Sequence, residues 1–217
     1  MLSMASSAAP QIAAHLATHI STLGWRDAAP PEILSTALTE VPRGRITEIF
    51  GAGSSGRTTA LHSILAASTK LGEFAVLIDA NDSFDPSSAA AAGVELDRLT
   101  WIRCRGDAGH AMRAADLVIH AGGFGVVGVD LAGAADSALS RIPSTTWFRW
   151  RRAIESTPTV LAVIAARPLT KSCSALLIEM KRRRAVFSGN LLRGVEYEIA
   201  PRKPIGKEGR GVECAAC

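Results

Sequence analysis

The chain has 217 residues, of which 47% are hydrophobic and 20% charged, with 24 Lys and Arg against 20 Asp and Glu. This length fits one domain with a substantial core, and the composition excludes an intrinsically disordered chain. No stretch approaches the roughly 18 apolar residues of a membrane span, so we expect no membrane partner. Four cysteines are too few for a disulfide scaffold, and the first residues lack a signal-peptide pattern, so a cytoplasmic location is expected.

The N-terminal residues predict a helix and then a turn. Residues 10–23 (PQIAAHLATHISTL) carry apolar side chains at near-helical spacing, and DAAPPEI is turn-forming. We predict an N-terminal helix for oligomerisation or docking in residues 1–25, a core domain in residues 26–203 and a flexible basic tail in residues 204–217.

Strand and helix patterns alternate along the core. ITEIF reads as a strand, GAGSSG as a loop, and RTTALHSILAASTKLG as a helix that ends at Gly72. Apolar or β-rich runs predict further strands at FAVLIDA, WIRCR, GVVGVDLAG and TVLAVIAAR, and helical patterns separate them. ALLIEMKRRRAVF and VEYEIAPRK alternate in polarity and predict antiparallel edge strands. This order predicts an α/β fold with a mostly parallel central sheet, flanking helices and an antiparallel C-terminal edge.

GAGSSGRTT, Gly51 to Thr59, lies between a predicted strand and a predicted helix. It has the form of the nucleotide-binding phosphate loop G-x-x-x-x-G-K-[ST], with Arg57 in place of the lysine. In such a loop, glycines let the backbone wrap a phosphate, and the next helix offers unpaired N–H groups to the anion. Thr58 is placed to hold Mg²⁺, which leaves two alternatives open: weak binding of ATP with Mg²⁺, or no cofactor.

The residues around this loop resemble the ATPase core of RecA. From Gly44 to Arg103 the chain follows that family's order: a strand, an E-x-x-G-x-x-S-S-G-K-T-T loop, a helix and a strand running into I-D-A-E. GVVGVDLAG is similar to the family's strand that ends in a Mg²⁺-binding acid, here Asp130. The resemblance covers roughly residues 20–200 and implies a RecA-like P-loop core. The implied nucleotide-binding residues are Gly51, Gly53, Ser54, Ser55, Gly56, Arg57, Thr58, Thr59 and Asp130, with Mg²⁺ held through Thr58 and Asp130.

Several residues depart from the catalytic pattern that the resemblance implies. Arg57 replaces the phosphate-binding lysine, and its planar fork is bulkier. Asn81 replaces the glutamate that activates water, and an amide cannot accept a proton. Ala165 and Ala166 replace an Asn-Gln pair whose glutamine senses the γ-phosphate, and the DNA-binding loop that follows is shortened to ARPLTKSCS. We therefore expect weak or absent ATP hydrolysis and assign no catalytic residue.

Two basic segments are candidate contacts with DNA or a partner. RIPSTTWFRWRRAIE interleaves aromatic and basic residues, which suits single-stranded DNA, a protein interface, or an amphipathic helix that packs Phe148 and Ile154 on the sheet. KRRR suits DNA, an acidic partner, or protection of a strand edge. The candidate residues are Arg141, Trp147, Arg149, Trp150, Arg151, Arg152, Lys181, Arg182, Arg183 and Arg184.

The resemblance leaves three functions open. The first is an accessory protein of the ImuA type, a degenerate RecA paralogue of bacterial mutagenesis cassettes that acts as an adaptor for error-prone translesion synthesis in the SOS response. Its implied partners are an ImuB-type polymerase homologue and an error-prone polymerase, with single-stranded DNA, RecA or a second copy as further contacts. The second is a divergent DNA-dependent ATPase that works as a recombinase. The third is a cell-division inhibitor of the SulA type, which lacks the phosphate loop and is disfavoured by the nearly intact loop here.

Overall fold

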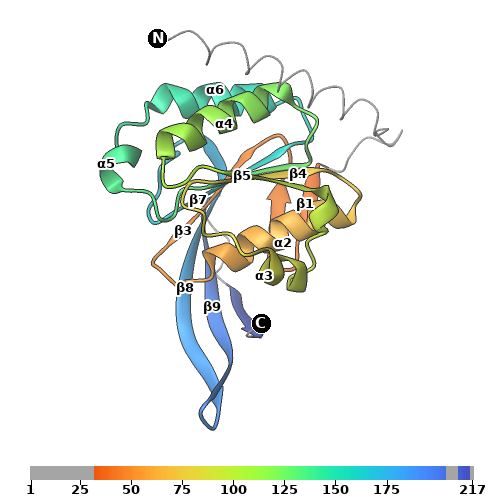
Figure 1. The fold of residues 1–217 in the computed structure, drawn as a ribbon, viewed down its shortest axis with the longest axis vertical. Coiled ribbons are helices and arrows are strands. Elements are labelled where there is room, and N and C mark those ends of the chain that lie inside the picture. Colours follow the sequence, from red (N-terminus) through yellow and green to blue (C-terminus); the bar gives the residue numbers. More distant parts are fainter. Residues whose placement is uncertain (1–31, 204–209, 216–217) are drawn as a thin grey trace.

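The computed structural model describes residues 32–203 and 210–215, which form two sheets and the helices that flank them (Figure 1). The larger sheet has eight strands in the order β10-β9-β8-β3-β7-β6-β4-β5. The six strands from β8 to β5 are parallel to one another, and β9 and β10 are antiparallel to their neighbours. The predicted α/β fold with a mostly parallel sheet and an antiparallel C-terminal edge is therefore confirmed.

The elements follow the chain in the predicted order. The strands of the large sheet are β3 (Ile46–Gly51), β4 (Ala75–Asp79), β5 (Leu99–Arg103), β6 (Val126–Asp130), β7 (Val160–Ala165), β8 (Ser174–Ser188), β9 (Leu191–Lys203) and β10 (Arg210–Ala215). The helices are α2 (Arg57–Lys70), α3 (Pro86–Ala91), the 3-10 helix η1 (Leu96–Arg98), α4 (Ala108–Ala121), α5 (Asp136–Leu139) and α6 (Ser144–Ile154). A small sheet of β1 (Ile33–Ser35) and β2 (Glu40–Pro42), which the sequence analysis missed, precedes them. The helix predicted in residues 1–25 lies outside the described residues.

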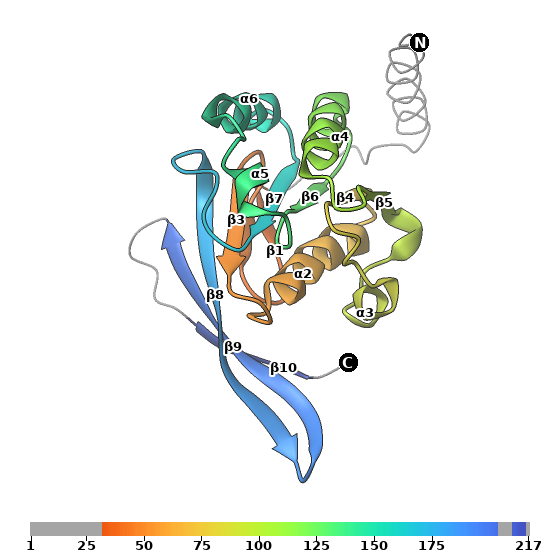
Figure 2. The same ribbon diagram turned by 60° about the vertical axis from the view of Figure 1, so that its left-hand side comes forward.

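The central strands are apolar throughout because helices cover both faces of the sheet. In β7, Val163 belongs to a core cluster with α4 and α6, and its neighbour Ile164 belongs to a second cluster with α2. Figures 1 and 2 show α4 and α6 over one face, and α2 and α3 over the other. In residues 32–203, no helix is long and apolar enough to cross a membrane.

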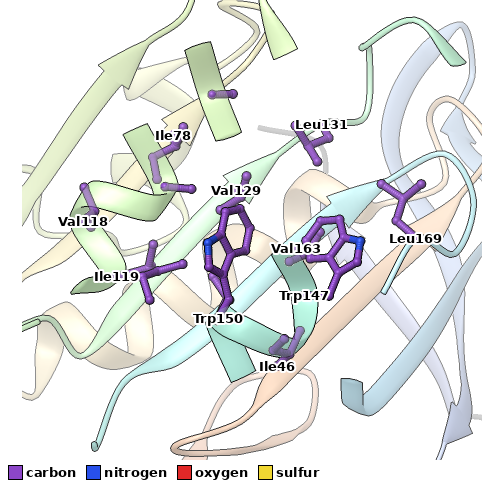
Figure 3. Packing of buried hydrophobic residues seen from close by; sticks show 14 of the residues in the cluster. Ile46, Ile78, Val118, Ile119, Val129, Leu131, Trp147, Trp150, Val163 and Leu169 are labelled. Carbon is purple, nitrogen blue, oxygen red and sulfur yellow. The ribbon is translucent and has the colours of Figure 1, made fainter. Parts of the chain in front are cut away.

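The two tryptophans of α6 are core residues, which corrects their assignment to a DNA or partner surface. Trp147 and Trp150 are 2% and 0% exposed and pack edge to face with ring centroids 5.2 Å apart. Figure 3 shows both rings inside the apolar cluster that includes Val129 and Val163. Phe148, expected to pack on the sheet in the amphipathic alternative, is instead 46% exposed. Trp147, Trp150 and Ile154 share a helix face at i, i+3 and i+7, the spacing that could have indicated this.

The end of the chain is not wholly the flexible tail that was expected. Residues 210–215 form β10 and pair with β9 from Arg210 opposite Ile199 to Ala215 opposite Gly194. The outer edge of β9 offers unpaired N–H and C=O groups, and β10 satisfies them. Residues 204–217 contain two Lys and Arg and two Glu, so the segment is also not basic, and the positive charge lies before it.

β8 and β9 form a long ribbon that runs beyond the rest of the sheet (Figures 1 and 2). β8 is expected at an edge, but from Leu177 to Met180 it lies between β3 and β9. From residue 181 to Ser188, β9 is its one partner strand within the described part of the chain. The strands are joined by a tight turn in which Gly189 has a φ of 60°, a conformation that favours glycine.

The packing of α6 predicts losses of stability of very different size for two adjacent substitutions. Trp147→Ala removes a fully packed ring and should lower the free energy of unfolding by about 3–5 kcal/mol. Phe148→Ala should lower it by less than about 1 kcal/mol, because the side chain is half in solvent. Urea denaturation of both variants measures the difference, and equal losses would contradict the orientation of α6 described here.

Candidate functional site

The glycine loop, residues 51–59, joins β3 to α2 at the carboxyl end of the parallel strands. Gly56 is the N-cap of α2 with a φ of 90°, and no side chain caps the helix. The first-turn N–H groups of α2 therefore have no side-chain acceptor, which is the arrangement that an anion uses at a helix N-terminus. Thr58 is exposed and Thr59 half-buried at this end of the helix.

The β8–β9 ribbon packs directly on the glycine loop. A Cβ added at Gly56 would lie 2.8 Å from the Tyr197 ring of β9, and one at Gly51 would lie 2.3 Å from the carbonyl oxygen of Met180. Both contacts are closer than real Cβ atoms permit, so glycine is required at these positions. Ser55 is buried beside them, and its Oγ has no hydrogen-bond partner among the described residues.

Arg57 turns back toward the sheet instead of standing free in solvent. Its Nη1 donates a hydrogen bond of 2.9 Å to the carbonyl oxygen of Ala165, the last residue of β7. Burial lowers the pKa of the guanidinium, and the charge of Asp130 acts in the opposite direction. The cation is thus partly desolvated and tied to a backbone carbonyl.

Asp79 and Asp130 end neighbouring strands, and both carboxylates are buried. Asp130 accepts a hydrogen bond from the Ala132 N–H at 2.9 Å. Burial raises the pKa of Asp130 and the charge of Asp79 adds to this, against the opposing effects of the Ala132 hydrogen bond and Arg57. Asp79 accepts from the N–H groups of Asn81 and Phe84 and from Trp101 Nε1.

Asn81 and Asp82, in the loop after β4, form hydrogen bonds with the loops after β6 and β5. With its amide oxygen toward the loop after β6, Asn81 accepts hydrogen bonds from the N–H groups of Gly133 and Ala134, at 3.1 and 3.2 Å. Asp82 has a φ of 57°, and its carboxylate contacts Arg103 Nη2 at 3.0 Å and the Arg105 N–H at 3.3 Å. Asp82 thus points toward the loop after β5, whereas the Asn81 amide faces the loop after β6.

The short loop after β7 is held by a buried carboxylate that the sequence analysis did not single out. Glu48 of β3 is 0% exposed and accepts hydrogen bonds from the N–H groups of Leu169 and Thr170 and from the Thr170 hydroxyl. Burial raises the pKa of Glu48, and these hydrogen bonds oppose that effect. Ala165 is buried and Ala166 exposed, and neither carries a polar side chain. An acid within the apolar strand ITEIF was the sequence feature that could have indicated a buried, hydrogen-bonded Glu48.

The structure distributes most of the basic candidate residues over two surfaces, helix α6 and the β8–β9 ribbon, and the inner end of the ribbon contacts the glycine loop. On α6, Arg149 is paired with Asp116 at 2.7 Å, Arg151 lies over the Phe148 ring at 5.3 Å, and Arg152 is exposed. On the ribbon, glutamates form ion pairs with three of the four cations of KRRR: the pairs are Lys181–Glu179, Arg183–Glu198 and Arg184–Glu196. Arg182 and Arg141 are exposed. The tryptophans are not part of either surface.

A parallel sheet with a glycine loop between its β3 strand and the α2 helix, and with acids at the ends of neighbouring strands, defines an α/β protein of the RecA-like fold class. A profile of the family described as the RecA N-terminal domain matches residues 32–140, half of the chain. The chain belongs to this family.

Individual relatives match between 92 and 118 residues of the chain in three examples. Protein RecA of Aquifex pyrophilus is 39% identical over 97 residues, which are 45% of this chain and 28% of that protein. Protein RecA of Chlamydia pneumoniae is 39% identical over 118 residues, 54% of this chain and 32% of that protein. The chloroplastic DNA repair protein recA homolog 1 of Arabidopsis thaliana is 44% identical over 92 residues, 42% of this chain and 20% of that protein. The matching segment is thus less than a third of each relative.

The burial of Asp130 predicts a pH dependence of stability. A folded-state pKa above the ordinary value means that the protonated acid is favoured in the fold, so its stabilising contribution is present at low pH and is lost as the pH rises through the raised pKa. Asp130→Asn, which resembles the protonated acid, should therefore gain stability relative to the wild type between about pH 4 and about pH 8.

Urea unfolding at the two pH values measures this gain. Asp97→Asn, an exposed acid, is the matched control and should show no comparable change. A constant difference between Asp130→Asn and the wild type at both pH values would contradict the predicted direction.

Proposed function

We propose that this chain is an accessory RecA-like protein of the ImuA type, which acts as an adaptor for error-prone translesion synthesis in the DNA damage response. The observation that carries the proposal is that residues at or beside the positions of the RecA catalytic groups make structural contacts here. Asn81 holds the loop after β6, Asp82 holds the loop after β5, and Arg57 is bonded to the Ala165 carbonyl. These contacts give each side chain a structural role, and an amide such as that of Asn81 cannot take a proton from a water molecule.

The glycine loop keeps the features that a nucleotide would use. The uncapped first turn of α2 fits a phosphate, the exposed Thr58 hydroxyl fits Mg²⁺, and Asp130 at the end of β6 is the acid that would complete the metal site. The magnesium complex of ATP, when bound, would supply the phosphates and the metal ion that these groups would hold. Arg57 would have to exchange the Ala165 carbonyl for a phosphate oxygen, and Asp130 would have to ionise despite its burial, so binding is expected to be weak.

The loop after β7 supports an adaptor more than a recombinase. Glu48 fastens its middle, Arg167 Nε bonds to Asp136 at 3.0 Å, and Lys171 Nζ bonds to Ser144 at 2.9 Å. A loop held at these points has its polar groups committed to the protein. Contacts with DNA or a partner then fall to the basic surfaces, of which α6 offers Phe148, Arg151 and Arg152.

The adaptor role predicts a stable complex with the ImuB-type polymerase homologue of the same organism, retained after nuclease treatment. If the α6 surface makes this contact, Arg151→Glu with Arg152→Glu should reduce the recovered partner by about fivefold or more, because like charges oppose the interface. Lys70→Glu, an exposed change on α2, is the control and should have no effect. No complex in the presence or absence of DNA would count against the adaptor role.

A DNA-dependent ATPase is the second candidate function, favoured by the uncapped α2 terminus beside Thr58. Under the adaptor proposal, phosphate release stays at background with single-stranded DNA, and calorimetry shows weak ATP binding that Thr58→Ala abolishes. Release that DNA stimulates and Thr58→Ala removes would establish the enzyme and overturn the proposal of weak or absent hydrolysis.

A further inference from the structure

A cavity of about 600 Å³ lies on the α4–α6 side of the sheet. Its walls come from the loop after β5, the first turns of α4, the end of α5 and the start of α6. The aliphatic part of the lining comprises Ala108, Met112, Ala138, Ile142 and Pro143, and the charged part comprises Arg105, Arg141 and Asp107. This volume is in the range of cavities that hold small ligands or a few side chains of a partner.

The charge of the lining favours an anion. Asp107 is occupied as the N-cap of α4, where its carboxylate accepts the His110 N–H at 2.9 Å and lies 3.2 Å from His110 Nδ1. Arg105 and Arg141 have no ion pair with any described residue. Two guanidinium groups therefore border the cavity without an ion pair of their own among these residues, against the single carboxylate of Asp107, so the lining has an excess of positive charge. Guanidinium matches a carboxylate in shape and charge.

Arg105 also has an unusual backbone conformation. Its φ is 53°, a left-handed value that costs energy for a long side chain and that glycine adopts readily. The Asp82 carboxylate accepts its N–H, and the next residue, Gly106, donates to the Ala80 carbonyl oxygen at 2.7 Å. The loop after β4 thus holds an arginine at the cavity in a conformation that does not favour arginine.

We propose that this cavity binds an acidic, aliphatic segment of a partner protein, with Arg105 and Arg141 taking a carboxylate and Met112 and Ile142 taking the neighbouring apolar side chains. A nucleic acid fits less well, because single-stranded binding relies on aromatic stacking and the described lining contains no aromatic side chain. Methionine, by contrast, adapts to varied aliphatic partners. The identity of the partner rests on the proposed adaptor function, whereas binding at the cavity requires neither nucleotide nor DNA.

The test uses the full chain with methyl-labelled methionine and two probes, acetyl-Leu-Glu-Leu-amide and acetyl-Leu-Gln-Leu-amide. The glutamate peptide should shift the Met112 signal and bind about tenfold more tightly than the glutamine peptide, because the guanidinium groups contact the charge. The Met180 signal should stay unchanged, since that residue is buried in the cluster on the α2 side.

Variants separate the cavity from general electrostatics. Arg105→Gly suits the left-handed backbone and should weaken the glutamate peptide by about tenfold, as should Arg141→Gln. Arg45→Gln, which removes an exposed cation from the start of β3, should leave the affinity unchanged. Arg105→Asn is the second variant should the glycine variant prove unstable, because asparagine also tolerates this conformation.

Several results would overturn the proposal. They are the absence of a Met112 shift, equal binding of the two peptides, an equal loss in Arg45→Gln, or displacement of the peptide by a dT oligonucleotide that depends on Arg105 and Arg141. The last result would assign the cavity to nucleic acid. A failure here concerns this cavity alone, whereas failure to co-purify a polymerase homologue concerns the adaptor role, so the two are distinguishable.

Discussion

The buried carboxylate of Asp79, at the end of β4, organises the loop on which both candidate sites depend. It accepts the N–H groups of Asn81 and Phe84 and the indole N–H of Trp101. A buried carboxylate that is satisfied in this way is costly to move, because its donors would lose a charged acceptor in a region without water. Asp79 thus fixes the loop after β4. This loop places Asn81 against the loop after β6 and Asp82 against the loop after β5, which lines the cavity.

The ribbon of β8 and β9 constrains the glycine loop through direct contacts. Tyr197 lies against Gly56, and the Met180 carbonyl lies against Gly51, so the position of the ribbon and the shape of the glycine loop are mechanically linked. The outer half of the ribbon is held by exposed ion pairs such as Arg183–Glu198, and pairs of this kind contribute little stability. The close contacts with the glycine loop thus lie at the well-packed end of the ribbon.

At the carboxyl edge of the sheet, residues proposed for nucleotide chemistry make contacts with neighbouring loops and strands. Asn81 can accept hydrogen bonds from two backbone N–H groups because an amide keeps an oxygen acceptor without a charge to desolvate. Arg57 reaches the Ala165 carbonyl with a guanidinium that projects several donors in a plane. Each contact joins a side chain at this edge to the backbone of a neighbouring loop or strand, beside a glycine loop of regular form.

The sequence by itself determined the order of strands and helices in the parallel part of the sheet, the form of the glycine loop and the presence of an amide at position 81. These features are local: apolar runs mark strands covered on both faces, and Gly51–Thr59 and Asn81 are read from their own residues. Tertiary structure alone decided that Tyr197 covers Gly56, that Glu48 holds Thr170 and that Arg105 borders a cavity with Arg141. These contacts join residues far apart in the chain, and they depend on strand register and loop direction, which no local pattern encodes.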